Sequence, residues 1–165
     1  MLRNLLFFVL CGFLPLFASA QLTEDMPIFK KHGTPPPFKL TLPDSTFTTA
    51  DKLTKKNKDM IVIVFSVECD HCKHLTEAII KNIDKFKDKQ VLMITPFALP
   101  RMREYYNYFH IGKYPNITMA SEPTRQIMNY YDLQYFPGAY TYGKKDHKLV
   151  KNFEGTVEWS DLLTQ

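Results

Sequence analysis

The sequence is poor in cysteine, with three among 165 residues, and only Cys69 and Cys72 form a Cys-x-x-C pair. This scarcity excludes a domain held together by many disulfides, because such scaffolds need several pairs along the chain. It also disfavours a structural zinc site, which usually takes two such pairs or suitably spaced histidines. The loop that the pair would close holds two residues, so little chain entropy would be removed. We therefore expect the pair to serve chemistry rather than stability, with an inert local disulfide as the alternative.

Charge of one sign does not accumulate, and long apolar runs are rare. The chain carries 21 basic and 17 acidic side chains, and the lysines at 52–58 have acidic neighbours in Asp51 and Asp59. This pattern is typical of a solvated helix face and predicts no nucleic-acid partner. After residue 20, no run is long and apolar enough to predict a membrane span.

Residues 1–20 form a separate class of sequence. Arg3 precedes an apolar run over residues 5–17, and Ala18, Ser19 and Ala20 supply the small side chains that a signal peptidase reads. We interpret residues 1–20 as a signal peptide that is cleaved after Ala20 and leaves with Cys11. The remaining chain is then exported to the periplasm or another extracytoplasmic space, where disulfides persist.

Beyond the signal peptide, we expect a lead-in at residues 21–34 and one domain at residues 35–165. Gly33 and the prolines at 35–37 should keep the lead-in irregular and extended. Apolar patterns predict strands at 38–42 (an edge strand), 61–65, 91–94, 117–119, 139–142 and 149–153. Helix patterns begin at Thr49, as a cap for 50–57, at Cys72, at Pro100, at Ser121 and at Thr156, again as a cap. This alternation predicts an α/β domain with parallel early strands and a closing antiparallel hairpin.

The chemistry is expected where the apolar strand at 61–65 gives way to a helix. Cys69 would lie at the first helical turn, where unpaired backbone N–H groups and the helix dipole favour a thiolate. Cys72 lies one turn further on, in phase with the buried stripe of the helix. We predict that Cys69 attacks a partner disulfide and that Cys72 then attacks Cys69 and releases the partner.

Three neighbours should tune the ionisation of Cys69 in opposite directions. A protonated His71 would stabilise the thiolate, whereas Glu68 and Asp70 would favour the thiol. The direction of electron flow therefore stays open. Pro137, which follows Phe136 before a predicted strand, is either the punctuation of a strand or a cis proline.

Together these motifs resemble the thioredoxin superfamily, and more narrowly its exported TlpA/ResA-like thiol–disulfide oxidoreductases. Residues 64–73 are similar to the active-site segment, Phe136–Pro137 to the cis-proline segment, and Gly155 to the glycine before the last helix. Residues 38–49 resemble the N-terminal hairpin of that branch, and residues 98–131 its AhpC/TSA-like helix–strand insertion. The resemblance implies a thioredoxin-like fold, a central mixed sheet flanked by helices.

The resemblance also implies roles for single residues. Pro137 would be cis, would pack beside the cysteine pair, would help to bind the partner polypeptide and would discourage metal capture. Phe136 would offer backbone contacts to the substrate. Ile63 and Leu75 stand where relatives carry an acidic proton acceptor, and Glu68 stands where they carry tryptophan. We hypothesise that Glu68 substitutes as the proton acceptor.

We therefore expect an extracytoplasmic oxidoreductase that exchanges disulfides with protein substrates and serves cell redox homeostasis. It would be monomeric, would need no cofactor or metal, and would receive electrons from a membrane or periplasmic partner. One alternative is a non-enzymatic module that binds a protein, or binds copper through Cys69, Cys72 and a distant histidine such as His110 or His147. A peroxiredoxin-like peroxidase is a weaker alternative, because Ser66 matches the threonine of Pro-x-x-x-Thr-x-x-Cys only loosely.

Overall fold

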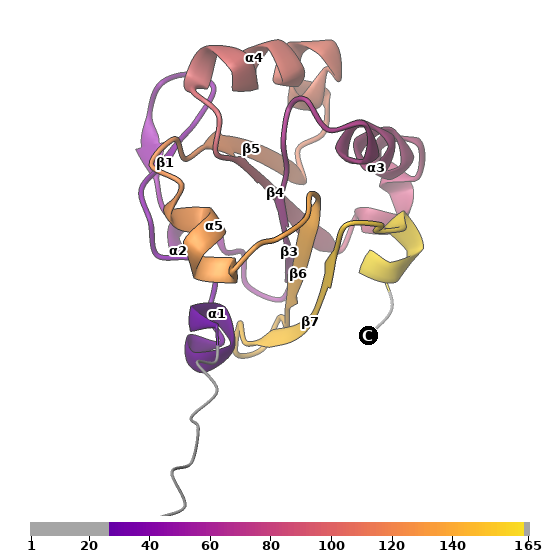
Figure 1. Cartoon of the computed structure of the whole chain (residues 1–165). Helices are drawn as coiled ribbons and strands as arrows, with labels where there is room; N and C mark the ends of the chain where they lie inside the picture. The colour runs from indigo at the N-terminus through magenta and orange to yellow at the C-terminus, as the bar shows by residue number, and fades with distance from the viewer. Residues whose placement is uncertain (1–26, 164–165) are drawn as a thin grey trace, which may run out of the picture.

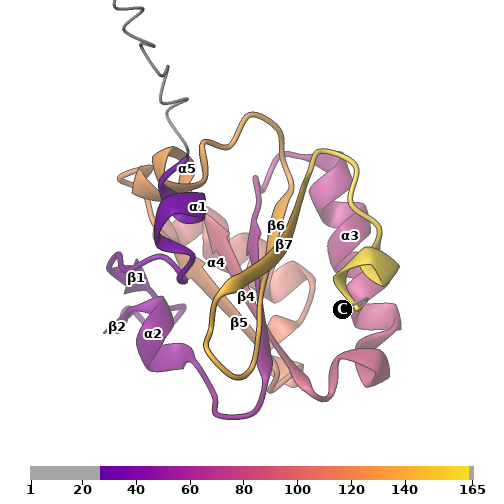
Figure 2. The ribbon, with the colours of Figure 1, turned by 90° about the horizontal axis from the view of Figure 1, so that it is seen from below.

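A single mixed sheet organises the chain in the computed structural model, which describes residues 27–163. Within this range the strand order is β2-β1-β5-β4-β3-β6-β7, with helices on both faces (Figures 1 and 2). The strands are β1 (Leu40–Thr41), β2 (Phe47–Thr48), β3 (Asp59–Val64), β4 (Lys89–Thr95), β5 (Ile117–Ser121), β6 (Gly138–Tyr142) and β7 (Leu149–Glu154). The α-helices are α1 (Ile28–His32), α2 (Ala50–Leu53), α3 (Asp70–Lys81), α4 (Leu99–Tyr108) and α5 (Gln126–Tyr131). The 3₁₀ turns are η1 (Ile83–Phe86), η2 (Ile111–Lys113) and η3 (Trp159–Leu162).

Strand directions agree with the α/β prediction. β3, β4 and β5 are parallel, while β6 runs antiparallel to both β3 and β7. Because parallel neighbours need crossovers, α3 and α4 carry the chain back along the sheet between these strands. The predicted N-terminal hairpin is also present as β1 and β2. The edge strand, however, is β2, because β1 pairs with β5 through Thr41 and Ser121.

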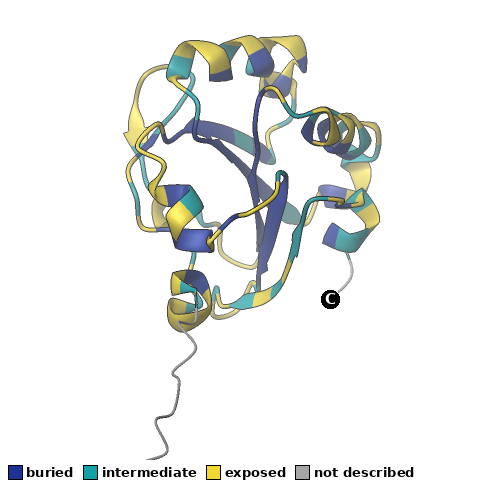
Figure 3. Ribbon diagram, viewed as in Figure 1, coloured by how far each residue is buried: buried dark blue, intermediate teal, exposed yellow. Residues whose placement is uncertain are grey.

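The sheet separates two apolar cores, and the central strands are buried on both faces (Figure 3). Alternate residues of β3 supply the two sides: Ile61 and Ile63 pack under α3 and α4, and Val62 and Val64 pack under α1 and α5. A strand covered on both faces needs no polar alternation, which explains the continuous apolar run in the sequence. No helix of residues 27–163 is both long and apolar enough to cross a bilayer.

The lead-in was expected to be irregular, and this expectation is wrong for residues 28–32. They form α1, and Phe29 is buried with its ring 5.4 Å from that of Tyr131 and 5.2 Å from that of Tyr140. One helical turn is too short to show an apolar period in the sequence, so only the tertiary contact reveals it. The predicted signal peptide and Cys11 lie outside the described residues.

Three other helices agree only in part with the prediction. α2 begins at Ala50 after Thr49, as predicted, but it ends at Leu53, and Thr49 makes no capping hydrogen bond through its side chain. Ser121 belongs to β5 instead, and the Glu122 carboxylate accepts the Ile127 N–H at 2.9 Å at the start of α5. The last turn is capped by Glu158 rather than Thr156, through a capping box with Asp161.

Candidate active site

Cys69 is the N-cap residue of α3, immediately after the loop that leaves β3. Its backbone N–H donates to the Ser66 carbonyl at 3.3 Å, and the Ser66 hydroxyl accepts the Glu68 N–H at 3.2 Å. This turn aims the Cys69 sulfur at the open end of the helix, where it accepts the Cys72 N–H at 3.3 Å. A sulfur in this position accepts a hydrogen bond from one of the unpaired backbone N–H groups of the helix and lies at the positive end of the helix dipole. Both interactions stabilise a thiolate.

The two sulfurs have different surroundings. Cys69 is partly exposed, whereas Cys72 is 1% exposed and lies in the core under α3; the two are not disulfide-bonded in this structure. Burial raises the pKa of the Cys72 thiol well above its usual range, and the neighbouring Cys69 raises it further. Cys69 is therefore the sulfur that a partner can reach, and Cys72 stays a protonated thiol in the core.

The segment before β6 completes the surroundings of Cys69. The Phe136–Pro137 peptide bond is cis, as the resemblance implies. The Phe136 carbonyl oxygen is 3.8 Å from the Cys69 sulfur, and the buried Pro137 accepts the Gly155 N–H through its carbonyl at 3.0 Å. Residues 67 positions apart in the chain thus meet at one sulfur.

The three residues predicted to tune Cys69 lie at the rim of the site and are all exposed. The Glu68 carboxylate accepts from Arg101 at 3.1 Å, and the Asp70 carboxylate accepts from Lys73 at 2.9 Å, which lowers the pKa of Asp70. Among the described residues no hydrogen bond connects Glu68 with Cys72. Glu68 is thus engaged with α4, and the structure gives no support to it as the proton acceptor for a buried thiol.

Two residues that the sequence analysis missed lie directly behind the pair. The Thr76 hydroxyl is 2.8 Å and the Tyr105 hydroxyl 3.1 Å from the Cys72 carbonyl oxygen, and the two hydroxyls are 2.9 Å apart. Both side chains are buried, and burial raises the pKa of Tyr105 so that it stays a neutral donor. The signal in the sequence was a threonine one turn after Cys72 on an otherwise apolar stripe. These hydroxyls tie the first turn of α3 to α4.

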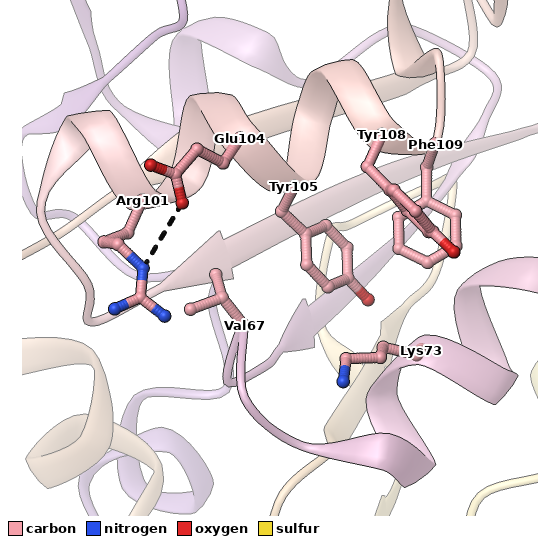
Figure 4. Close-up of a pocket in the computed structure, with 7 residues that line it drawn as sticks. All are labelled: Val67, Lys73, Arg101, Glu104, Tyr105, Tyr108 and Phe109. Atoms are coloured by element: carbon pink, nitrogen blue, oxygen red, sulfur yellow. Dashed lines mark ion pairs between the residues drawn. The ribbon is translucent and has the colours of Figure 1, made fainter.

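A cavity of about 390 Å³ opens beside the β3–α3 loop (Figure 4). Its lining comes from that loop, from the start of α3 and from α4 with the residue after it: Val67, Lys73, Arg101, Glu104, Tyr105, Tyr108 and Phe109. Apolar surface dominates its wall, and charged side chains stand at its edge.

The copper alternative needs a histidine beside both cysteines. Residues 27–163 contain no group of three or more His, Cys, Asp and Glu side chains that could hold a metal ion. His147 belongs to the turn after β6, whereas Cys69 follows β3, which runs antiparallel to β6; the two therefore lie at opposite ends of the sheet. The described arrangement thus gives the copper site no third ligand from this histidine.

No protein-family model and no curated protein matches the sequence. Solved structures do match the fold. The pneumococcal exposed lipoprotein thioredoxin Etrx1 from Streptococcus pneumoniae aligns with a TM-score of 0.56 and 17% identity, over 74% of this chain and 92% of that chain. ScoI from Arabidopsis thaliana, solved with copper bound, gives a TM-score of 0.60 and 18% identity, over 77% and 91%.

A third structure is a secreted Mycobacterium tuberculosis disulfide oxidoreductase described as homologous to E. coli DsbE. It aligns with a TM-score of 0.60 and 14% identity, over 77% of this chain and 92% of that chain. These likenesses show that the chain has a thioredoxin-like fold, and they confirm the fold prediction. A shared fold at such low identity does not by itself assign an activity.

Proposed function

We propose that this chain is an extracytoplasmic thiol–disulfide oxidoreductase that acts on protein substrates through Cys69 and Cys72. The observation that carries the proposal is the unequal setting of the two sulfurs. One is partly exposed and accepts a helix N-terminal N–H at 3.3 Å, and the other is buried one turn behind it. A structural disulfide has no need of such an asymmetry, whereas an attacking and a resolving thiol require it.

The proposed exchange runs in two steps. The Cys69 thiolate attacks one sulfur of a partner disulfide, so that a Cys69–partner bond forms and the other partner sulfur leaves as a thiolate. Cys72 then loses its proton and attacks the Cys69 sulfur, which forms the Cys69–Cys72 disulfide and releases the second partner thiolate. The partner is reduced by two electrons and the pair is oxidised by two. The reverse sequence oxidises a partner dithiol.

Phe136 and Pro137 are proposed to position the partner, because the Phe136 carbonyl lies 3.8 Å from the attacking sulfur. Glu68, Asp70 and His71 lie exposed at the rim of the site, where a bound partner would partly cover them. Their exposure favours contact with the partner over a role as proton donors or acceptors in the exchange.

The extracytoplasmic location rests on the signal-peptide pattern of residues 1–20. It is supported by neighbours described as an exposed lipoprotein and as a secreted oxidoreductase. In such a compartment the pair would serve redox homeostasis, and a reductase would need a membrane or periplasmic partner to supply electrons. The monomeric state is part of the same proposal.

The test is reversible redox cycling of the purified protein in glutathione or dithiothreitol buffers of graded potential. We expect the Cys69–Cys72 disulfide to form and to be reduced reversibly as a two-electron couple. A potential near that of thioredoxin, about −270 mV, would indicate a reductase, and one near that of DsbA, about −120 mV, an oxidase. If the pair fails to cycle in either buffer, the proposed function is wrong.

A further inference from the structure

The cavity beside the β3–α3 loop has a preformed aromatic wall. Four rings follow one another in tilted and edge-to-face contacts: Phe65 and Tyr105 have centroids 4.8 Å apart, Tyr105 and Phe109 4.6 Å, and Phe109 and Tyr108 4.8 Å. Phe65, Tyr105 and Phe109 are buried, while Tyr108 is 73% exposed; Figure 4 shows Tyr105, Tyr108 and Phe109 on one side of the cavity. An aromatic side chain held this way presents apolar surface to solvent without needing to reorganise on binding.

The charges at the edge of the cavity are already paired with one another. Lys73 contacts Asp70 at 2.9 Å, and Arg101 contacts both Glu68 at 3.1 Å and Glu104 at 3.5 Å. A charged ligand would have to compete with these neighbours, whereas an apolar group would leave them intact. The chemistry of the lining therefore selects an apolar occupant.

The cavity also adjoins the reactive sulfur. Val67, which lines it, precedes Cys69 by two residues, and two residues of chain span at most about 7 Å. Lys73 also lines it, from the first turn of the helix that Cys69 caps. A polypeptide joined to Cys69 can thus reach the cavity with a side chain two or three residues from its own cysteine, because extended chain advances about 3.3 Å per residue.

We propose that this cavity is a specificity site for the partner polypeptide, and that it takes one large apolar side chain flanking the partner's cysteine. The inference rests on the proposed function and adds to it a substrate class: extended segments in which the reacting cysteine has an aromatic or large aliphatic neighbour. Tyr108, Tyr105 and Val67 provide the contact surface.

The test uses short peptides with a single cysteine linked to glutathione as a mixed disulfide. In each peptide, one of the positions two or three residues before or after the cysteine carries phenylalanine, and the reference peptide carries serine at all of them. The rate at which each peptide oxidises the reduced protein is measured. We expect the best phenylalanine peptide to react about tenfold faster than the serine peptide, the effect of burying most of one large apolar side chain.

Variants of the protein then test whether the preference for phenylalanine arises at this cavity. Tyr108→Ala should bring the ratio of the two rates close to one, and Tyr108→Phe should keep it, because the ring and not the hydroxyl makes the contact. Phe47→Ala removes another exposed ring, on the outermost strand β2, and should change neither rate. Circular dichroism must first show that each variant is folded, because an unfolded chain would react with both peptides alike and would also bring the ratio to one.

Equal rates for the phenylalanine and serine peptides in the wild-type protein would overturn this inference while leaving the proposed function in place. The same holds for a preference that survives Tyr108→Ala. A protein that neither the peptides nor glutathione disulfide can oxidise would overturn the proposed function, and this inference with it.

Discussion

The two faces of the central sheet are packed in different ways. Under α3 and α4, the core includes the buried Cys72 thiol and two hydroxyls, and it opens to solvent at Cys69 and at the neighbouring cavity. Under α1 and α5, stacked tyrosines fill the space: the rings of Tyr131 and Tyr140 lie 3.5 Å apart, and the Tyr131 and Tyr142 hydroxyls are 2.9 Å apart.

This difference indicates that one face of the sheet serves stability and the other serves chemistry. The tyrosine face buries large rings and pairs their hydroxyls, so it contributes stability without offering a reactive group to solvent. The cysteine face keeps a buried thiol beside an exposed one and therefore supports chemistry. Substitutions on the cysteine face should therefore change exchange rates, and substitutions on the tyrosine face should change the free energy of unfolding.

The largest effect is expected at the two sulfurs. Cys69→Ser should lower the rate of exchange with glutathione disulfide at least a thousandfold, because no other exposed thiol lies in residues 27–163. Cys72→Ser should leave the first attack possible and trap glutathione on Cys69, as seen by intact-protein mass spectrometry. Accumulation of glutathione on Cys72 in the Cys69→Ser variant, at a comparable rate, would reverse the assigned roles.

On the tyrosine face, Tyr131→Ala should lower the free energy of unfolding by about 3–5 kcal/mol, the range for removing a large buried ring. Tyr131→Phe should cost about 1–2 kcal/mol, because the Tyr142 hydroxyl loses its partner. Urea denaturation measures both. The folded protein of each variant should still exchange disulfides at the wild-type rate. A slower exchange by folded Tyr131→Phe protein would contradict the separate roles of the two faces.

The buried thiol should also give the resolving step a distinct pH dependence. Because the pKa of Cys72 is raised above its usual range, the thiol is protonated at neutral pH and its thiolate fraction rises tenfold per pH unit. The rate at which Cys72 displaces glutathione from Cys69 should therefore climb about tenfold per unit from pH 6 to pH 9. Stopped-flow measurement on the preformed mixed disulfide tests this, and a plateau near pH 7 would be inconsistent with it.

The smallest effect is expected at the hydroxyls behind the pair. Tyr105→Phe keeps the ring contacts with Phe65 and Phe109 but removes the hydroxyl that lies 3.1 Å from the Cys72 carbonyl. We expect a loss of about 1 kcal/mol in unfolding free energy, with Tyr108→Phe, at an exposed ring, as a matched control near zero. An equal change in unfolding free energy in both variants would show that the Tyr105 hydroxyl does not stabilise the site.

Local patterns in the sequence were sufficient for much of the fold. The unbroken apolar run of β3, the apolar stripe of α3 and the polar turn between β6 and β7 all predicted their elements, because each is a pattern contained in one short segment of the chain. α1 could not be predicted in this way, since its single buried residue, Phe29, is fixed by contacts with distant rings. The late start of α5 depends on the Glu122 carboxylate, whose capping contact is visible only in three dimensions.

The same distinction between local patterns and contacts across the fold applies to the candidate site. Cys69 and Cys72 were identifiable because their spacing and the strand-to-helix change lie within one short segment. The hydroxyls of Thr76 and Tyr105 meet across two helices, and the cavity is formed by a loop and two helices, so neither leaves a pattern in the sequence. Glu68 was hypothesised to substitute as the proton acceptor, but its side chain pairs with Arg101 on α4.

The asymmetry of the two cysteines can be measured directly by limited alkylation of the reduced protein with iodoacetamide at pH 7, followed by peptide mass spectrometry. The structure predicts that Cys69 is modified first and that Cys72 stays largely unmodified until the protein unfolds, since one sulfur is partly exposed at a helix N-terminus and the other is buried. Equal modification of both cysteines in the folded protein, or faster modification of Cys72, would contradict the assignment of an attacking and a resolving thiol.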